Sequence, residues 1–157
     1  MIRRPITADG KKRLDELLKR LIKEERPKVI QAIKEARAHG DLSENADYDA
    51  AKEQQALLEG RISDLSEKLS QAQVVDVSKI SSDKIIFGAS IELKDLDKDE
   101  IFHYQIVGEE EADVKQGRIS INSPLAKKMI GLKKNNSFLL QTPKGEREYQ
   151  IINFYFK

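Results

Sequence analysis

The sequence YDAAKEQQALLEGRISDLSEKLSQA, residues 48–72, decides the fold of this chain. Along it, mostly apolar side chains recur in alternating steps of three and four residues, and the residues between them are mainly polar. The members of this row, called the seam below, are Tyr48, Ala51, Gln55, Leu58, Ile62, Leu65, Leu69 and Ala72. Such a heptad pattern predicts a helix that buries one narrow face against a partner helix.

The partner helix is predicted upstream of the seam, starting from an N-cap at Thr7. Its apolar stripe comprises Leu14, Leu17, Leu18, Leu21, Ile22, Val29, Ile30, Ile33 and Ala36. Pro27 lacks an N–H donor, so the sequence predicts a kink or a break near Glu25–Arg26. His39 and Gly40 are typical of a helix end, because glycine adopts positive φ at little cost.

The two predicted helices are joined by only a few residues, so they must run antiparallel and form a hairpin. At about 1.5 Å per residue, roughly 28 residues make a rod of roughly 40 Å. The periodicity also fits a plain coiled-coil scaffold. That alternative predicts a stable dimer that is indifferent to changes at the turn.

After Val74 the sequence changes to short segments rich in β-branched and aromatic residues, separated by turn signals. Strands are predicted at residues 74–77, 85–93, 101–107, 118–121, 138–142 and 148–156. Ser123 and Pro124 predict the start of one short helix, with Ser as the N-cap and Pro at the first helical position. Gly131 predicts its end.

The predicted fold class is therefore α+β, with two parts. Residues 1–75 form an antiparallel coiled-coil hairpin with an acidic tip at residues 41–47. Residues 76–157 form a small β-sheet domain with one short helix.

Composition excludes several classes of protein. The chain of 157 residues has no Cys, which rules out disulfide scaffolds, thiol catalysis and cysteine-ligated zinc. Its two His are too few for a His-rich metal site. The sequence shows neither the apolar core of a signal peptide nor an apolar run of membrane-spanning length, so a soluble, cytoplasmic protein is expected.

The formal net charge of +1 hides an uneven distribution. Residues 1–40 carry 12 basic and six acidic side chains, whereas residues 41–59 carry six acidic side chains and one basic. The arrangement of charge along the chain is therefore more informative than its sum.

The turn between the helices concentrates four acids, Asp41, Glu44, Asp47 and Asp49. A capping box formed by Asp41 and Glu44 would explain two of them. The acidic side chains in excess of those two repel one another, and this repulsion favours a cationic partner. Two carboxylates supply only part of the oxygen shell that Mg²⁺ prefers, so another macromolecule would have to complete a metal site. Arg37 and Lys52, just behind the turn, suit a phosphate backbone, although ordinary surface charge is the alternative.

Residues 36–48, ARAHGDLSENADY, resemble the signature of bacterial GreA transcript cleavage factors, and AKEQQ (51–55) and EGRI (59–62) continue the resemblance. ISINSPLA (119–126) resembles the C-terminal motif of the family, and Val107-Gly108 with Glu111-Ala112-Asp113 fits as well. The match spans essentially the whole chain, and the EQQ run favours the GreA branch over GreB. Lys52 stands where many relatives are expected to have Arg, which keeps the charge.

The resemblance implies a transcription elongation factor that is not itself an enzyme. Its hairpin would enter the secondary channel of a backtracked bacterial RNA polymerase and stimulate cleavage of the RNA 3′ end by the polymerase. By this resemblance Asp41 and Glu44 would help to hold the second catalytic Mg²⁺ and position the attacking water. Arg37 and Lys52 would hold the 3′ segment of the nascent RNA.

The same resemblance implies an FKBP-like fold for the C-terminal domain, which would dock on the rim of the channel near Asp113, Ser123 and Pro124. No cofactor is expected on the chain alone, because the Mg²⁺ belongs to the polymerase active site. A monomer without membrane contact is expected, acting in transcription complexes on DNA.

Other functions remain as alternatives. The closest is a Gre homologue that occupies the same channel without cleavage and inhibits the polymerase; the paired acids favour cleavage. A DksA-type regulator typically has a cysteine zinc site, which this chain cannot form. A prolyl isomerase or chaperone would need an aromatic-lined pocket, and the chain has no Trp, with Phe and Tyr sparse outside the last predicted strand.

Overall fold

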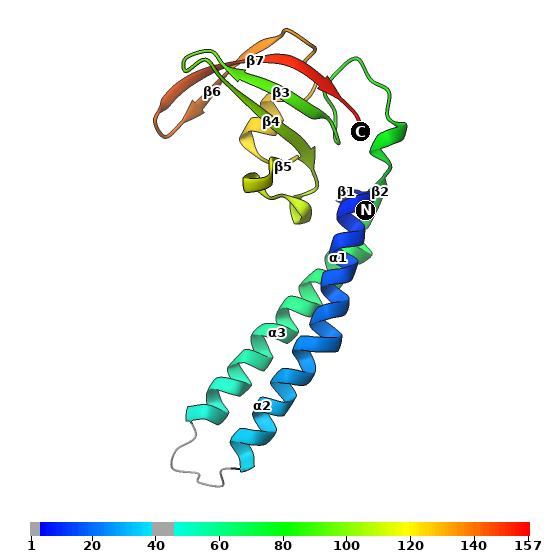
Figure 1. The fold of residues 1–157 in the computed structure, drawn as a ribbon, viewed down its shortest axis with the longest axis vertical. Coiled ribbons are helices and arrows are strands. Elements are labelled where there is room, and N and C mark those ends of the chain that lie inside the picture. Colours follow the sequence, from blue (N-terminus) through cyan, green and yellow to red (C-terminus); the bar gives the residue numbers. More distant parts are fainter. Residues whose placement is uncertain (1–3, 39–45) are drawn as a thin grey trace. The chain divides into compact units, whose positions relative to one another are not determined.

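The computed structural model describes residues 4–38 and 46–157. Contacts divide the chain into two compact units, Lys12–Gln71 on one hand and Met1–Lys11 with Ala72–Lys157 on the other. We call them the hairpin unit and the sheet unit and describe each by itself (Figure 1). Together they are the predicted α+β fold, a helical hairpin followed by a small mixed sheet with one short α-helix.

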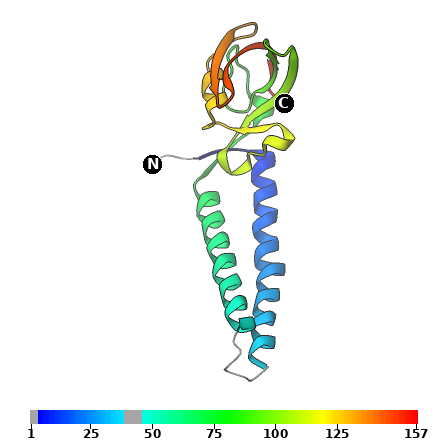
Figure 2. The same ribbon diagram turned by 90° about the vertical axis from the view of Figure 1, so that its left-hand side faces the viewer.

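The hairpin is built from α1 (Ala8–Arg20), the π-helical segment η1 (Leu21–Glu25), α2 (Arg26–Ala38) and α3 (Ala46–Ser70). α2 and α3 lie side by side in both ribbon views (Figures 1 and 2). The predicted seam is confirmed, since Ala51 and Ile62 are buried and its other six members are half-buried. Its last member, Ala72, lies beyond the helix and starts a strand.

The helix before the turn continues past Pro27 without a break. The N–H of Arg26 donates to the carbonyl oxygen of Leu21, five residues back, which is the π-helical pattern. This wider turn accommodates Pro27, because proline has no N–H to donate and its ring would clash with the carbonyl group four residues before it in a regular α-helix. Within the predicted stripe, Ile22 and Ile30 are 37% and 41% exposed, so the prediction was wrong for these two residues.

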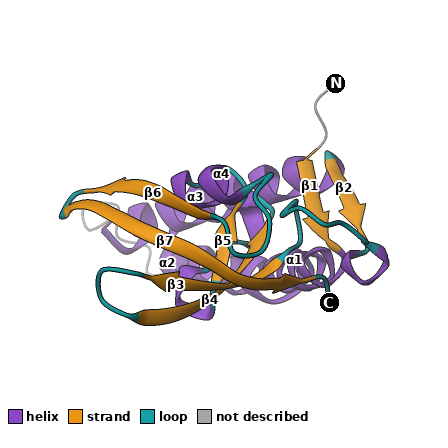
Figure 3. Ribbon diagram, turned by 90° about the horizontal axis from the view of Figure 1, so that it is seen from above, coloured by secondary structure: helices purple, strands orange, loops and turns teal. Residues whose placement is uncertain are grey.

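The sheet unit contains two sheets (Figure 3). In the smaller one, β1 (Arg4–Thr7) pairs in parallel with β2 (Ala72–Val75), so the start of the chain packs with the chain that follows the hairpin. The larger sheet has the order β5-β4-β3-β7-β6. Its strands are β3 (Ser90–Asp95), β4 (Glu100–Val107), β5 (Arg118–Ser120), β6 (Ser137–Thr142) and β7 (Gly145–Tyr155).

Four short helices complete the sheet unit: η2 (Val77–Lys79), η3 (Glu109–Glu111), η4 (Val114–Gln116) and α4 (Pro124–Met129). α4 begins as predicted, because the Ala126 N–H donates to Ser123 Oγ at 3.2 Å and Pro124 occupies the first turn. Its buried face joins the core through Ala126 and Met129. The strand predicted at residues 85–93 begins only at Ser90. No helix of the described residues is long and apolar enough to cross a membrane.

The start of α1 is held by a carboxylate from far along the chain. Thr7 is the N-cap, as predicted, since the Gly10 N–H donates to Thr7 Oγ1 at 3.0 Å. Glu111 is buried and accepts from the Thr7 N–H at 2.8 Å and the Gly108 N–H at 2.9 Å. A Cβ on Gly10 would lie 1.9 Å from Glu111 Oε1, so glycine makes room for this carboxylate.

Candidate functional site at the end of the hairpin

The predicted functional end of the hairpin is the connection between Ala38, the last residue of α2, and Ala46, the first residue of α3. The two predicted acids, Asp41 and Glu44, belong to this connection and lie outside the described residues. Their assignment as metal ligands therefore stays a prediction. The structure describes the residues on both flanks.

One contact joins the two helix ends. The Arg37 guanidinium lies 5.6 Å from the centre of the Tyr48 ring, and its Nη2 is 3.5 Å from the Tyr48 hydroxyl, long for a hydrogen bond. A cation over a tyrosine face is stabilised by the ring quadrupole. Tyr48 thus packs in the seam and also contacts the Arg37 guanidinium at the end of α2.

The second predicted RNA-binding residue, Lys52, lies one helical turn after Tyr48 on α3. Its Nζ is 3.1 Å from Gln55 Oε1, and the side chain is exposed. Among the described residues, neither Lys52 nor Arg37 forms an ion pair with a carboxylate.

The first turn of α3 explains part of the acidic excess at the turn. Asp47 and Asp49 both stand in it. Carboxylates at this end of a helix interact favourably with its dipole. This stabilisation accounts for two of the four acids, Asp47 and Asp49.

Within residues 4–38 and 46–157, the structure shows no group of three or more His, Asp or Glu side chains arranged to hold a metal ion. The predicted donor set, two carboxylates in the connection, suits part of an oxygen shell but not a complete one. A magnesium ion shared with a partner macromolecule stays a prediction for this chain.

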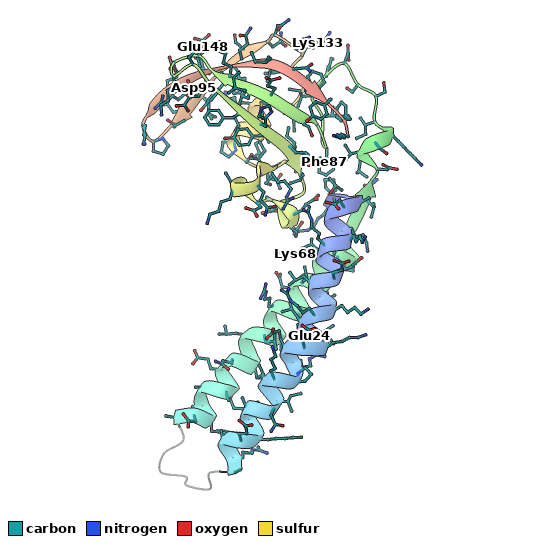
Figure 4. All side chains as sticks on the ribbon, viewed as in Figure 1. Glu24, Lys68, Phe87, Asp95, Lys133 and Glu148 are labelled. Carbon is teal, nitrogen blue, oxygen red and sulfur yellow. The ribbon has the colours of Figure 1, made fainter. Side chains whose placement is uncertain are left out.

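A bidentate ion pair crosses the hairpin away from the turn. Arg26 Nε and Nη2 donate to the two carboxylate oxygens of Glu59 at 2.7 and 2.8 Å. These bonds raise the pKa of Arg26 and lower the pKa of Glu59. Sequence reasoning missed this pair, because its members lie 33 residues apart on two different helices. Figure 4 shows the side chains along the hairpin.

The structure gives the three predicted partner-binding residues specific positions in the sheet unit. Asp113 forms a backbone bridge with Arg118, Ser123 caps α4, and Pro124 stands in the first turn of that helix. Asp113 precedes β5, and the other two follow it. Their role in binding a partner stays a prediction.

The sheet unit also has an open groove of about 310 Å³ that the sequence did not reveal. Phe102, Pro143 and Tyr149 line it together with Asp95 and Arg147, whose charged groups are 3.9 Å apart. Burial, assisted by the nearby Asp95, raises the pKa of Tyr149. Two aromatic side chains, Phe102 and Tyr149, stand in the lining of this groove. These aromatic residues are far apart in sequence, and the sheet brings them together.

Two sequence models of protein families match the chain. Residues 4–74 match "Transcription elongation factor, N-terminal", and residues 80–156 match "Transcription elongation factor, GreA/GreB, C-term". Together they cover nearly all of the chain, including the connection with Asp41 and Glu44.

Full-length sequence relatives named GreA agree with these matches. "Transcription elongation factor GreA" of Beijerinckia indica subsp. indica is 56% identical over 153 residues, which is 98% of either chain. The protein of the same name from Trichlorobacter lovleyi is 52% identical over 98% of this chain and 97% of its own. A solved structure, GreA factor homolog 1 (Gfh1) of Thermus thermophilus, is 29% identical, with a TM-score of 0.46, over 98% of this chain and 99% of that one.

Proposed function

The chain belongs to the GreA/GreB family of transcription elongation factors, and from this premise we propose that it stimulates cleavage of the RNA 3′ end by a backtracked bacterial RNA polymerase. It is a transcription elongation factor of the GreA type. In this proposal the hairpin enters the secondary channel of the polymerase, and the polymerase active site carries out the hydrolysis.

One observation carries the proposal most directly. In sequence, the two acids of the GreA-like signature stand in the connection between two helices, and Arg37 contacts Tyr48 at the helix ends that flank this connection. The outer positions of α3 are exposed and mostly polar. A narrow polar hairpin can carry two carboxylates into a confined aqueous site with little bulk behind them.

The chemistry assigned to the acids follows from their donor atoms. In the polymerase complex, Asp41 and Glu44 would contribute oxygen ligands to a Mg²⁺ ion and accept hydrogen bonds from the attacking water. The metal supplies charge stabilisation at the phosphate and a lowered pKa of bound water. Water adds to phosphorus and the bond to the 3′ oxygen breaks. The retained RNA then ends in a 3′ hydroxyl, and the released fragment begins with a 5′ phosphate.

The cationic residues behind the acids would hold the substrate. Arg37, which contacts Tyr48, would donate to phosphate oxygens of the extruded 3′ segment. Lys52 would add a second positive charge one turn further along α3. Neither contact carries sequence information, so cleavage would tolerate any RNA sequence.

The sheet unit would bind the rim of the channel near Asp113, Ser123 and Pro124. The Ser123 hydroxyl already caps α4, so its contribution would be to hold the turn in shape. Pro124, in the first turn of α4, would provide direct contact.

The deciding experiment adds the protein and Mg²⁺ to stalled polymerase complexes with extruded 3′ RNA. Short 3′ fragments and renewed elongation are expected. Binding without fragments, together with slower elongation by active complexes, would instead indicate a channel-binding inhibitor. Absence of binding to the polymerase would refute the proposal.

A further inference from the structure

The five-stranded sheet has one covered border and one open border. At the β5 border, Asp113 exchanges two backbone hydrogen bonds with Arg118, at 2.8 and 3.0 Å, so the chain itself continues the ladder. At the other border, β6 pairs with β7 on one side, and no described strand pairs with its other side (Figure 3).

The register identifies the backbone groups that point outward from β6. Thr142 pairs with Gly145 across a two-residue turn, and the residues that flank such a turn form a hydrogen-bonded pair. Because such pairs alternate along an antiparallel ladder, Gln141, Leu139 and Ser137 direct their N–H and C=O groups away from β7. No described residue satisfies these groups with a hydrogen bond.

This edge lacks the usual protection against pairing. Natural edge strands carry charged residues, proline or a bulge that prevent the addition of a further strand. The sequence of β6, SFLLQT, has no charged residue and no proline, and its pairing with β7 is regular. Leu139 is 49% exposed and offers apolar surface beside the free backbone groups.

Positive charge flanks the same strand at both ends. Between Val114 and Gly145 the sequence has seven basic residues and no acidic residue. Lys133 and Lys134 precede β6, and Lys144 follows it in the turn to β7. Lys133, labelled in Figure 4, has an ion pair with Asp83 at 3.6 Å, whereas no described carboxylate lies within ion-pair distance of Lys134 or Lys144.

We propose that β6 accepts an extended segment of another protein as an added strand, and that this segment carries acidic residues at both ends of an apolar or neutral centre. The backbone groups of Ser137, Leu139 and Gln141 would give the affinity, and the lysines at either end would select acidic flanks. This inference does not depend on the proposed function of the hairpin.

Charge and hydrogen-bonding capacity argue against other occupants of this edge. If β6 paired antiparallel with β6 of a second copy, Lys133 and Lys134 of one copy would face Lys144 of the other, which is repulsive. A nucleic acid would meet outward carbonyl oxygens, which repel phosphate, as well as N–H groups. A peptide backbone matches both kinds of group.

The test uses the full-length protein and two synthetic peptides with the same six-residue Val/Thr centre, one flanked by Glu and one by Lys. Hydrogen exchange is followed by NMR for single amides. The Glu-flanked peptide is expected to slow exchange at the amides of Ser137, Leu139 and Gln141 and to leave the β5 border unchanged. The Lys-flanked peptide is expected to have little effect.

Two pairs of variants separate the backbone and charge contributions. Leu139→Pro removes one outward N–H and is expected to abolish binding, whereas Leu139→Thr keeps the N–H and should retain most of it. The double variant Lys134→Glu/Lys144→Glu should weaken binding about tenfold at low salt. The matched double variant Lys127→Glu/Lys128→Glu on α4 should have a much smaller effect. Thermal unfolding confirms that each variant is folded.

Three outcomes would overturn the proposal. Equal binding of both peptides would remove the charge selection. Concentration-dependent protection of β6 without peptide would identify a second copy as the occupant. Failure of the Glu-flanked peptide to protect β6, with or without binding of an RNA oligonucleotide to the same lysines, would mean that the lysines only prevent edge association.

Discussion

The hairpin and the sheet unit are stabilised in different ways. Among the described residues of the hairpin unit, the buried apolar side chains are Leu21, Ala51 and Ile62, and the rest of the interface is half-buried. The sheet unit has one contiguous buried cluster of nine residues. A hairpin with so little core keeps most of its surface available to a partner, while the sheet unit has the kind of core that supports an independent fold.

The largest expected effect should separate activity from stability in the hairpin. In the proposed mechanism, Asp41→Asn and Glu44→Gln should each lower stimulated RNA cleavage about a hundredfold or more, because each would remove the negative charge of a proposed metal ligand. The free energy of unfolding, measured in urea, should hardly change. Asp49→Asn, in the first turn of α3, is the matched control and should cleave at nearly the wild-type rate. Wild-type cleavage by both tip variants would disprove the assignment.

The next effect compares the two cores directly. Leu93→Ala in the sheet unit removes a fully buried side chain and should lower the free energy of unfolding by about 3 kcal/mol. Leu65→Ala in the half-buried seam should lower it by about 1–2 kcal/mol. Leu57→Ala, at a side chain that is 70% exposed, should change it by less than about 0.5 kcal/mol. Urea unfolding of the three variants measures this order, and equal losses at Leu93 and Leu65 would contradict it.

Two glycines provide the same substitution in opposite environments. Gly10→Ala forces Glu111 away and leaves the Thr7 and Gly108 N–H groups without a partner, so it should destabilise by about 1–3 kcal/mol. Gly60 lies within α3, where an added Cβ would meet no other atom within 4 Å, so Gly60→Ala should stabilise by about 0.5–1 kcal/mol. Thermal unfolding measures both. If both substitutions changed the stability in the same direction, Glu111 would not hold the start of α1.

The smallest expected effect is a pH dependence of the stability that the hairpin gives to the fold. The hydrogen bonds from Arg26 lower the pKa of Glu59 below its ordinary 4.5. The pair therefore stabilises the fold fully above that ordinary value, and the stabilisation is lost as the pH falls through the lower pKa of the folded state. Melting temperatures of wild type and Glu59→Gln should differ at neutral pH and converge in acid. Because the pair is exposed, added salt should reduce the difference. A difference that persists in strong acid would rule out this ion pair as its cause.

The sequence alone determined those features that depend on neighbouring residues. The period of the seam predicted which side of α3 is buried, since a helix repeats its faces every few residues. The caps at Thr7 and Ser123 were also predictable, because each accepts a hydrogen bond from an N–H three residues on. The GreA-like signature at residues 36–48 likewise identified the candidate acids before any fold was known.

Only the tertiary structure decided which distant residues meet. Thr7 and Glu111 are 104 residues apart, and no local pattern links them. The stacking of Phe138 on Tyr149 and the open edge of β6 depend on the strand order, which loop closure and core packing select together. The π-helical segment Leu21–Glu25, which interrupts the regular helix before Pro27, was likewise not predicted from the apolar pattern. Local hydrogen bonds depend on residues that are close together in the sequence, whereas packing depends on contacts between residues from the whole chain.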